Sequence, residues 1–299
     1  MDDESQPDSI SVGSVPGDLR VTDNLMVPSG VYLQTEARSS LSAGIQSSAV
    51  RLRYNDDDTV SVVLDGDTQS YVYRFSPIDG ASGRAADEDA EPGFWESLGL
   101  AEDFDPQSVL EGDDRVHFVG EHAGGDNLVF LAQVAPDDAY FVMSALADLD
   151  IGDSDLRLDR HAFFIVGEET NNAAGNLSGA ARYSGTAYAV RTEANNSVRD
   201  TLSGTASLEA NFTTNRVRMD IALQSSVGDD ASFAAEPWSG EGVNMGGSSF
   251  WMQLLGDGLN RGEAKGRFYG PNAANAAGVF EGEYGDSSRI DGVFGTTRQ

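Results

Sequence analysis

The sequence predicts a mainly β protein, in which an N-terminal antiparallel β module with a short helix precedes a C-terminal eight-stranded antiparallel β-barrel. Two observations predict this fold class. Short runs of alternating apolar and polar residues recur along the chain, as expected for strands with one buried face. Glycine accounts for 34 of the 299 residues, and glycines inside strand-sized runs are typical of barrel walls that bend sharply.

Strand-sized runs occupy the first half of the chain, separated by turn-forming Asn, Asp and Gly residues. Residues 49–54, 59–64 and 70–75 follow one another closely, which predicts a three-stranded meander. Further strands are expected at residues 30–35, 116–120, 127–134, 140–146 and 161–166. The segment 124–126, Gly-Gly-Asp, predicts a hairpin between two of them. Residues 94–100 are expected to form one or two helical turns.

The second half carries strand-sized runs at more regular spacing, with glycine recurring inside them. This pattern predicts an antiparallel barrel, whose closure removes the exposed strand edges that promote aggregation. The runs are residues 180–190, 202–211, 216–223, 248–255, 262–269, 277–283 and 289–295.

Charge divides the chain unevenly. The sequence has 49 acidic and 19 basic residues, a net charge of −30, and residues 1–166 hold 33 of the acidic residues with only 9 arginines. We therefore predict a flexible leader at residues 1–18, an acidic β domain at 19–166 and the barrel at 167–299. A chain this acidic lacks the clustered basic residues that nucleic acids and anionic membranes require, so neither is expected as a partner.

Absent residues and motifs narrow the functional classes further. Cysteine does not occur, which excludes disulfides, thiolate nucleophiles and cysteine-ligated zinc. The sequence contains no G-x-S-x-G nucleophile elbow, phosphate-binding loop or H-E-x-x-H motif, so we predict that the protein is not an enzyme. No apolar run is long enough for a transmembrane helix. The N-terminus lacks the features of an export signal, as in a cytoplasmic protein or a chain whose signal has been removed.

Three segments of the second half carry a family resemblance. They are residues 266–280 (GRFYGPNAANAAGVF), 292–298 (GVFGTTR) and 178–185 (SGAARYSG). Together they resemble the C-terminal barrel of the transferrin-binding-protein-B-like family, which comprises bacterial surface lipoproteins and secreted solute-binding proteins. The family usually has Glu and Gly where this chain has Asn275 and Ala277. We see no such match in residues 1–166.

The resemblance implies a bacterial protein at the outer-membrane surface or in the medium. Its implied function is to capture a ligand or a protein partner, with iron or haem acquisition as the first implication and an outer-membrane receptor as a further partner. The alternative is a structural or interaction protein of the cell surface that binds protein or calcium and carries no small molecule. We expect a monomer.

Four side chains are candidates for ligand contact or for the core. His117 and His122 are the candidates for axial haem ligands in a chain without cysteine. The alternative is that both are surface or hairpin-tip histidines. Trp238 follows a proline in an expected loop, where it would contact a ligand, whereas Trp251 is expected inside the barrel. His161 is expected at a strand edge.

Two acidic stretches are candidates for calcium binding, because they offer carboxylate oxygens at close spacing. Residues 148–155 have closely spaced acidic residues, but the sixth position of an EF-hand loop would be Asp153 in place of glycine and the twelfth would be Asp159 in place of glutamate. Residues 55–58 could join Asp65 and Asp67 across a hairpin. For both stretches, a solvated acidic turn is the favoured explanation and calcium binding the alternative.

Overall fold

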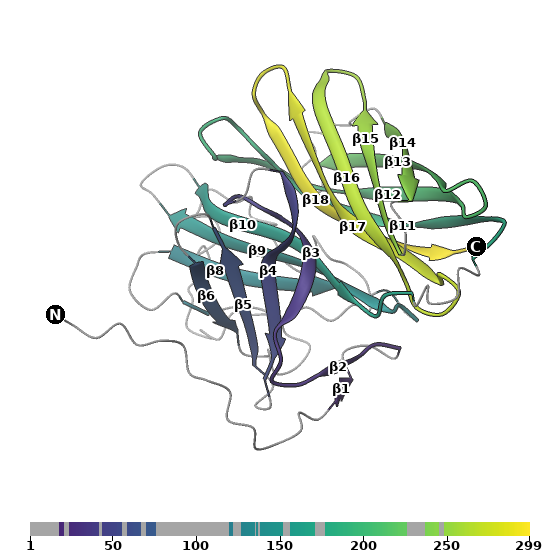
Figure 1. Ribbon diagram of the computed structural model, residues 1–299. Coiled ribbons are helices and arrows are strands. Elements are labelled where there is room, and N and C mark those ends of the chain that lie inside the picture. The colour runs from purple at the N-terminus through teal and green to yellow at the C-terminus, as the bar shows by residue number, and fades with distance from the viewer. Residues whose placement is uncertain are drawn as a thin grey trace.

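The structure is a computed structural model, and all of its described secondary structure is β (Figure 1). The helix predicted at residues 94–100 lies outside the described residues. These are residues 18–20, 24–41, 44–55, 59–66, 70–75, 120–121, 127–134, 136, 138–151, 156–170, 177–225, 237–244 and 248–299.

The first half of the chain forms an eight-stranded antiparallel sheet in the order β6-β5-β4-β3-β10-β9-β8-β7. The predicted meander is confirmed as β4, β5 and β6, which pair in sequence order. The strands are β3 (Leu33–Ser39), β4 (Ile45–Tyr54), β5 (Val60–Asp65), β6 (Ser70–Phe75), β7 (Gly120–Glu121), β8 (Asn127–Val134), β9 (Phe141–Ile151) and β10 (Leu156–Gly167). A short pair, β1 (Asp18–Arg20) and β2 (Met26–Pro28), precedes it.

The sheet curls around one apolar core, to which both of its halves contribute. Val62 and Phe75 from one half share this core with Leu131 from the other half. Polar contacts also cross the core: Tyr73 on β6 donates a hydrogen bond to Asp148 on β9, at 2.9 Å. The curl therefore brings strands from opposite ends of the sheet together.

The second half forms a closed antiparallel barrel of eight strands, as predicted. Paired residues trace one outward-facing row around the wall, which we call the outer row. It runs Arg182, Glu209, Arg218, Glu241, Gln253, Glu263, Glu281, Asp291 and returns to β11 at Val190. The strands are β11 (Ala180–Thr192), β12 (Val198–Asn211), β13 (Arg216–Ser225), β14 (Trp238–Asn244), β15 (Ser249–Leu255), β16 (Leu259–Tyr269), β17 (Asn275–Tyr284) and β18 (Arg289–Arg298). The row returns to β11 displaced along the strand, which reflects the tilt of strands in a closed barrel.

Two tryptophans have orientations opposite to those predicted from the sequence. Trp238 does not lie in a loop: it begins β14, which the sequence pattern missed, and is 1% exposed inside the barrel. Its ring packs edge-on against Phe280, and its indole nitrogen donates to the Tyr284 hydroxyl at 3.1 Å. Trp251 points out of the wall and is 36% exposed. The alternation along β15 decides this, because its neighbours Phe250 and Met252 point inward.

Glycines inside the barrel strands allow neighbouring backbones and core side chains to approach closely. A Cβ atom at any of five positions would overlap a backbone oxygen of the adjacent strand: Gly185, Gly204, Gly242, Gly278 and Gly292. The glycine-rich composition therefore has a packing cause in the second half of the chain.

The substitution Gly278→Ala tests this packing. Its Cβ would overlap the Lys265 carbonyl oxygen and lie 2.8 Å from the Phe294 ring. We expect the free energy of unfolding in urea to fall by about 1–3 kcal/mol, as for other overpacked sites. Gly285→Ala is the control, since its Cβ would have no neighbour closer than 3.8 Å. Equal stability of the two variants would contradict the packing explanation.

Candidate functional site

The curled sheet packs against one side of the barrel, where β3, β9 and β10 meet β17 and β18 (Figure 1). An apolar cluster fills this contact and includes Phe141 and Ile165 from the sheet with Val279 and Val293 from the barrel. Gly295 lets the two surfaces approach, because a Cβ there would lie 2.5 Å from the Phe141 ring. The two halves of the chain thus share a continuous apolar interface.

Beside this apolar cluster, the outer row presents three carboxylates on adjacent strands. Glu263 pairs in register with Glu281, and Glu281 pairs with Asp291. Like charges directly opposite one another destabilise a sheet. The barrel wall alone would therefore be unfavourable at this place, and basic groups are needed to compensate it.

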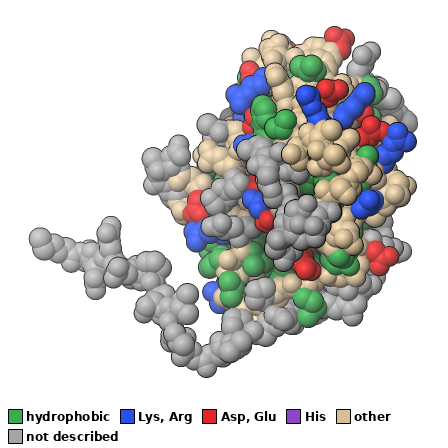
Figure 2. Space-filling model, turned by 45° about the vertical axis from the view of Figure 1, so that its right-hand side comes forward, with side chains coloured by type: hydrophobic (Ala, Val, Ile, Leu, Met, Phe, Trp, Pro, Cys, Tyr) green, Lys and Arg blue, Asp and Glu red, His purple; other side chains and the backbone are tan. Residues whose placement is uncertain are grey.

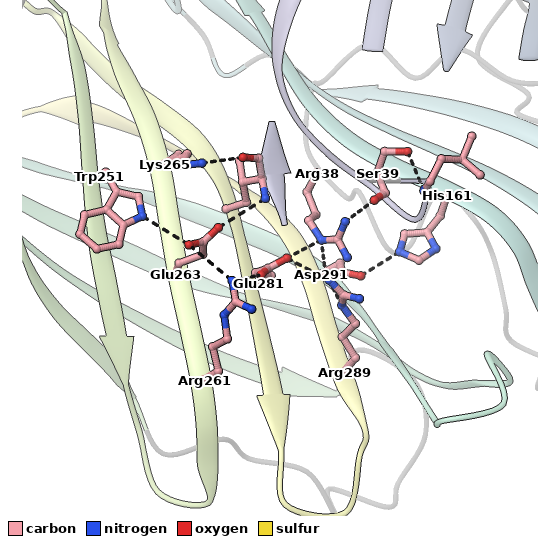
Figure 3. Close-up of polar contacts among 12 residues, drawn as sticks. Arg38, Ser39, His161, Trp251, Arg261, Glu263, Lys265, Glu281, Arg289 and Asp291 are labelled. Carbon is pink, nitrogen blue, oxygen red and sulfur yellow. Dashed lines mark hydrogen bonds and ion pairs between the residues drawn. The ribbon is translucent and has the colours of Figure 1, made fainter. Parts of the chain in front are cut away.

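Arg38, from β3 of the sheet, supplies the buried compensation (Figure 3). Its side chain is 0% exposed, and its Nε lies 2.6 Å from a Glu281 oxygen and 2.9 Å from an Asp291 oxygen. Arg289 approaches the same two carboxylates from the solvent side, at 2.9 and 3.1 Å. We call Arg38, Glu281, Arg289 and Asp291 the seam cluster.

His161 joins the seam cluster from β10. Its Nε2 lies 2.9 Å from the second Asp291 oxygen, and its backbone N–H donates to the Ser40 hydroxyl at 3.0 Å. The expectation that His161 lies at a strand edge was wrong, because β10 begins five residues earlier at Leu156. A histidine inside a buried ion-pair cluster serves to hold the interface.

Two further charged contacts tie the sheet to β16. Arg267 donates to a Glu36 oxygen through Nε at 2.8 Å and also contacts Glu169. Lys265, the single lysine of the chain, donates to the Ile45 carbonyl oxygen at 2.5 Å. The outward side chains of β16 are thus used to bind the sheet.

The family-like segment at residues 266–280 also contacts the sheet. Phe268 points into the barrel and Tyr269 points into the sheet–barrel interface. Asn275 accepts a hydrogen bond from the Tyr140 backbone N–H at 3.0 Å, and Ala277 packs in the apolar interface. Both departures from the family pattern therefore face the sheet, a role that the sequence did not reveal.

Burial of the seam cluster shifts the pKa of one of its carboxyl groups. Desolvation raises the pKa of Glu281, and the carboxylates of Asp291 and Glu263 add to the rise while Arg38 opposes it. The arginines pair with the carboxylate oxygens that a metal cation would need. Among the described residues, no group of three acidic or histidine side chains is arranged to hold a metal ion. The cluster is suited to fixing the sheet on the barrel.

The structure leaves the sequence-based ligand candidates apart from this site. His117 and His122 lie outside the described residues. Trp238 is in the barrel core and is not accessible for contact. In the acidic stretches, Asp148 is buried against Arg160 at 2.8 Å and Asp65 pairs with Arg51 at 2.7 Å. Residues 56–58, 67 and 152–155 lie outside the described residues, so calcium binding there stays a prediction.

The outer wall away from the sheet is open to solvent and carries mixed charges. Arg182 pairs with Glu209 at 2.9 Å on this wall, and both side chains are exposed. Figure 2 shows basic and acidic side chains interspersed over the barrel, with hydrophobic ones between them. In the part of the chain that the structure describes, no helix has the length and apolarity needed to cross a bilayer.

These features define a class: a closed β-barrel that carries a second, curled β-sheet fixed to its wall by buried ion pairs. Residues 177–298 match the family model for the C-lobe and N-lobe β-barrels of transferrin-binding protein B. This match confirms the resemblance of the barrel to the transferrin-binding-protein-B-like family that the sequence predicted. No curated protein matches the sequence.

The solved structures that this chain matches share little sequence with it. A mutant transferrin-binding protein B from Haemophilus parasuis has 14% identity and a TM-score of 0.46, with 92% of this chain and 62% of that chain covered. The isotype 1 protein from Neisseria meningitidis has 15% identity and a TM-score of 0.39, with 86% and 53% covered. The lactoferrin-binding protein B N-lobe of Moraxella bovis has 14% identity and a TM-score of 0.37, with 59% and 81% covered. The chain spans between about half and two thirds of the length of the transferrin-binding proteins.

Replacement of Arg38 tests the seam cluster. Arg38→Met leaves two buried carboxylates undercompensated, so we expect the free energy of unfolding to fall by about 3–5 kcal/mol. Adding Glu281→Gln should recover part of this loss, because one of those charges is removed. Arg182→Met breaks an exposed pair instead and should cost less than about 1 kcal/mol. Equal losses for Arg38→Met and Arg182→Met, measured by urea denaturation, would refute the buried compensation.

The raised pKa of Glu281 predicts a pH dependence. A raised pKa in the folded state means that the carboxyl contributes stability fully below its ordinary value of 4.5 and loses it as the pH rises through the folded value. Glu281→Gln does not titrate. The stability of the native chain relative to this variant should therefore fall as the pH increases from about 4.5. A rising difference for Glu281→Gln would contradict the pKa direction.

Proposed function

We propose that this chain is a bacterial binding protein, displayed at the cell surface or secreted, that captures a protein partner on its outer surface. The barrel family supports a binding role, since its name refers to transferrin binding. The observation that carries the proposal is the filled barrel interior. Large buried side chains occupy it, namely Tyr183, Trp238, Phe250, Phe268, Phe280 and Phe294.

A filled interior favours a macromolecular partner over an enclosed small ligand. Small-molecule sites are concave and bury most of their ligand. The groove on the barrel wall between Arg182 and Arg218 is open and charged, and is lined also by Glu209 and Asp220. Binding on an outer surface requires a scaffold that holds its shape, and the seam cluster provides one.

Iron acquisition from a protein carrier is the specific function that we propose. The names of the solved structures refer to transferrin and lactoferrin as bound proteins. An outer-membrane receptor would then receive the cargo. Haem capture is supported only by the sequence positions of His117 and His122, which lie outside the described residues. We propose a binding function and no catalytic one.

Binding measurements distinguish these functions. Immobilised chain should bind at least one member of a panel of iron-loaded and iron-free transferrins and lactoferrins, with a Kd of about 1 μM or tighter. Titration with haem should leave the Soret band unshifted. The opposite pair of results, no carrier bound and a Soret shift that His117→Ala or His122→Ala abolishes, would overturn the proposal in favour of haem capture.

A further inference from the structure

Three asparagines of the chain stand in the Asn-x-Ser/Thr pattern that accepts N-linked saccharides, namely Asn176, Asn195 and Asn211. Asn195 and Asn211 also follow a glutamate by two positions, whereas Asn176 has Ala174 there. Bacterial oligosaccharyltransferases recognise an acidic residue at that place, where its carboxylate pairs with a basic group of the enzyme. We infer that Asn195, at the tip of the hairpin between β11 and β12, is an acceptor site for an N-linked glycan.

Loop 193–197 joins β11 to β12 at one end of the barrel (Figure 1). Four of its five residues are exposed, among them Asn195. The loop touches the sheet through its backbone, where the Leu158 N–H donates to the Asn196 carbonyl oxygen at 3.1 Å. This contact uses no side chain of the loop. The folded chain therefore presents the Asn195 side chain to solvent.

The third residue of the motif, Ser197, is already placed on the Asn195 side chain. Its hydroxyl donates to the Asn195 Oδ1 at 2.5 Å, and its backbone N–H donates to the same oxygen at 3.0 Å. The two bonds form an Asx turn and involve only the oxygen of the amide. In the described part of the chain, Nδ2 of Asn195 has no hydrogen-bond partner. The nitrogen that a saccharide would join is thus accessible.

The recognition carboxylate, Glu193, is accessible in the same loop. Its side chain is 52% exposed, and its ion pair with Arg199 joins two exposed side chains at 3.9 Å. Exposed pairs of this kind contribute little free energy. The Glu193 carboxylate can therefore exchange Arg199 for a basic group of the enzyme at little cost.

The second complete motif, around Asn211, is held by the barrel. Its middle residue, Phe212, is 9% exposed and packs edge-on against Phe268 in the barrel core. The Thr213 hydroxyl accepts a hydrogen bond from the Gly179 N–H at 2.9 Å. An enzyme would have to open this hairpin in order to bind the motif. The fold therefore selects Asn195 over Asn211.

The saccharide donor for this transfer is an oligosaccharide linked to a polyprenyl diphosphate. A bond forms between Nδ2 of Asn195 and the anomeric carbon, and the bond from that carbon to the diphosphate oxygen breaks. The lipid diphosphate leaves with the electron pair, and the proton lost from Nδ2 passes to it or to solvent. In the cell this reaction takes place outside the cytoplasm. It therefore depends on the exported location proposed above and not on the captured partner.

The test incubates the purified, folded full chain with a bacterial oligosaccharyltransferase and its polyprenyl-diphosphate-linked oligosaccharide. Intact-mass and peptide mass spectrometry should show the gain of one oligosaccharide, located on Asn195. Asn195→Gln and Ser197→Ala should lose this gain, whereas Ser197→Thr should keep it. Glu193→Gln should slow the transfer at least about tenfold, because it removes a charged hydrogen bond to the enzyme.

Asn211→Gln is the matched control and should gain the oligosaccharide as the native chain does. A peptide that the enzyme is known to glycosylate verifies that the reagents are active. An unmodified native chain beside a modified peptide would overturn the inference. An oligosaccharide on Asn211 or Asn176 and none on Asn195 would also overturn it. Capture of an iron-carrier protein does not enter these outcomes, so this inference and the proposed function fail separately.

Discussion

The arrangement of the whole molecule depends on one buried guanidinium. Arg38 enters the interface fully desolvated and is held between Glu281 and Asp291. Burying a charge is costly unless it is paired. Arg38 and the two carboxylates therefore each need the other in order to be buried. Arg38 belongs to the sheet and the carboxylates belong to the barrel. The electrostatic requirement therefore couples two units that each have their own apolar core.

The outer row shows how the barrel distinguishes its two sides. On the open side Arg182, Glu209, Arg218 and Glu241 alternate in charge, and such cross-strand pairs are mutually favourable. On the sheet side the row becomes acidic, and Arg38 of the sheet adds a buried arginine to the barrel's own Arg289. The docked sheet thus compensates the acidic residues on one side of the barrel. On the other side, the charged residues of the row compensate one another. That other side, with its filled interior behind it, is the surface that we propose for binding.

The sequence was sufficient for the fold class because alternation and glycine spacing are local signals. It predicted the eight-stranded barrel and the meander, but it missed β14, whose Gly240 and Gly242 weaken the apolar alternation. The sequence also predicted Trp238 outside the barrel and Trp251 inside it, whereas the structure has the reverse. The seam cluster was not predicted, since Arg38 lies 253 positions from Asp291 and only the strand register brings them together. Pairings of this kind depend on tertiary structure and leave no local pattern.

If the seam cluster couples the sheet to the barrel, the two unfold as one cooperative body. Scanning calorimetry tests it directly on the native chain and on Arg38→Met. We predict one transition for the native chain, with the calorimetric enthalpy equal to the van't Hoff enthalpy, and one transition at a lower midpoint temperature for the variant. Two independent transitions in the native chain, or a single unchanged transition in Arg38→Met, would contradict the claim.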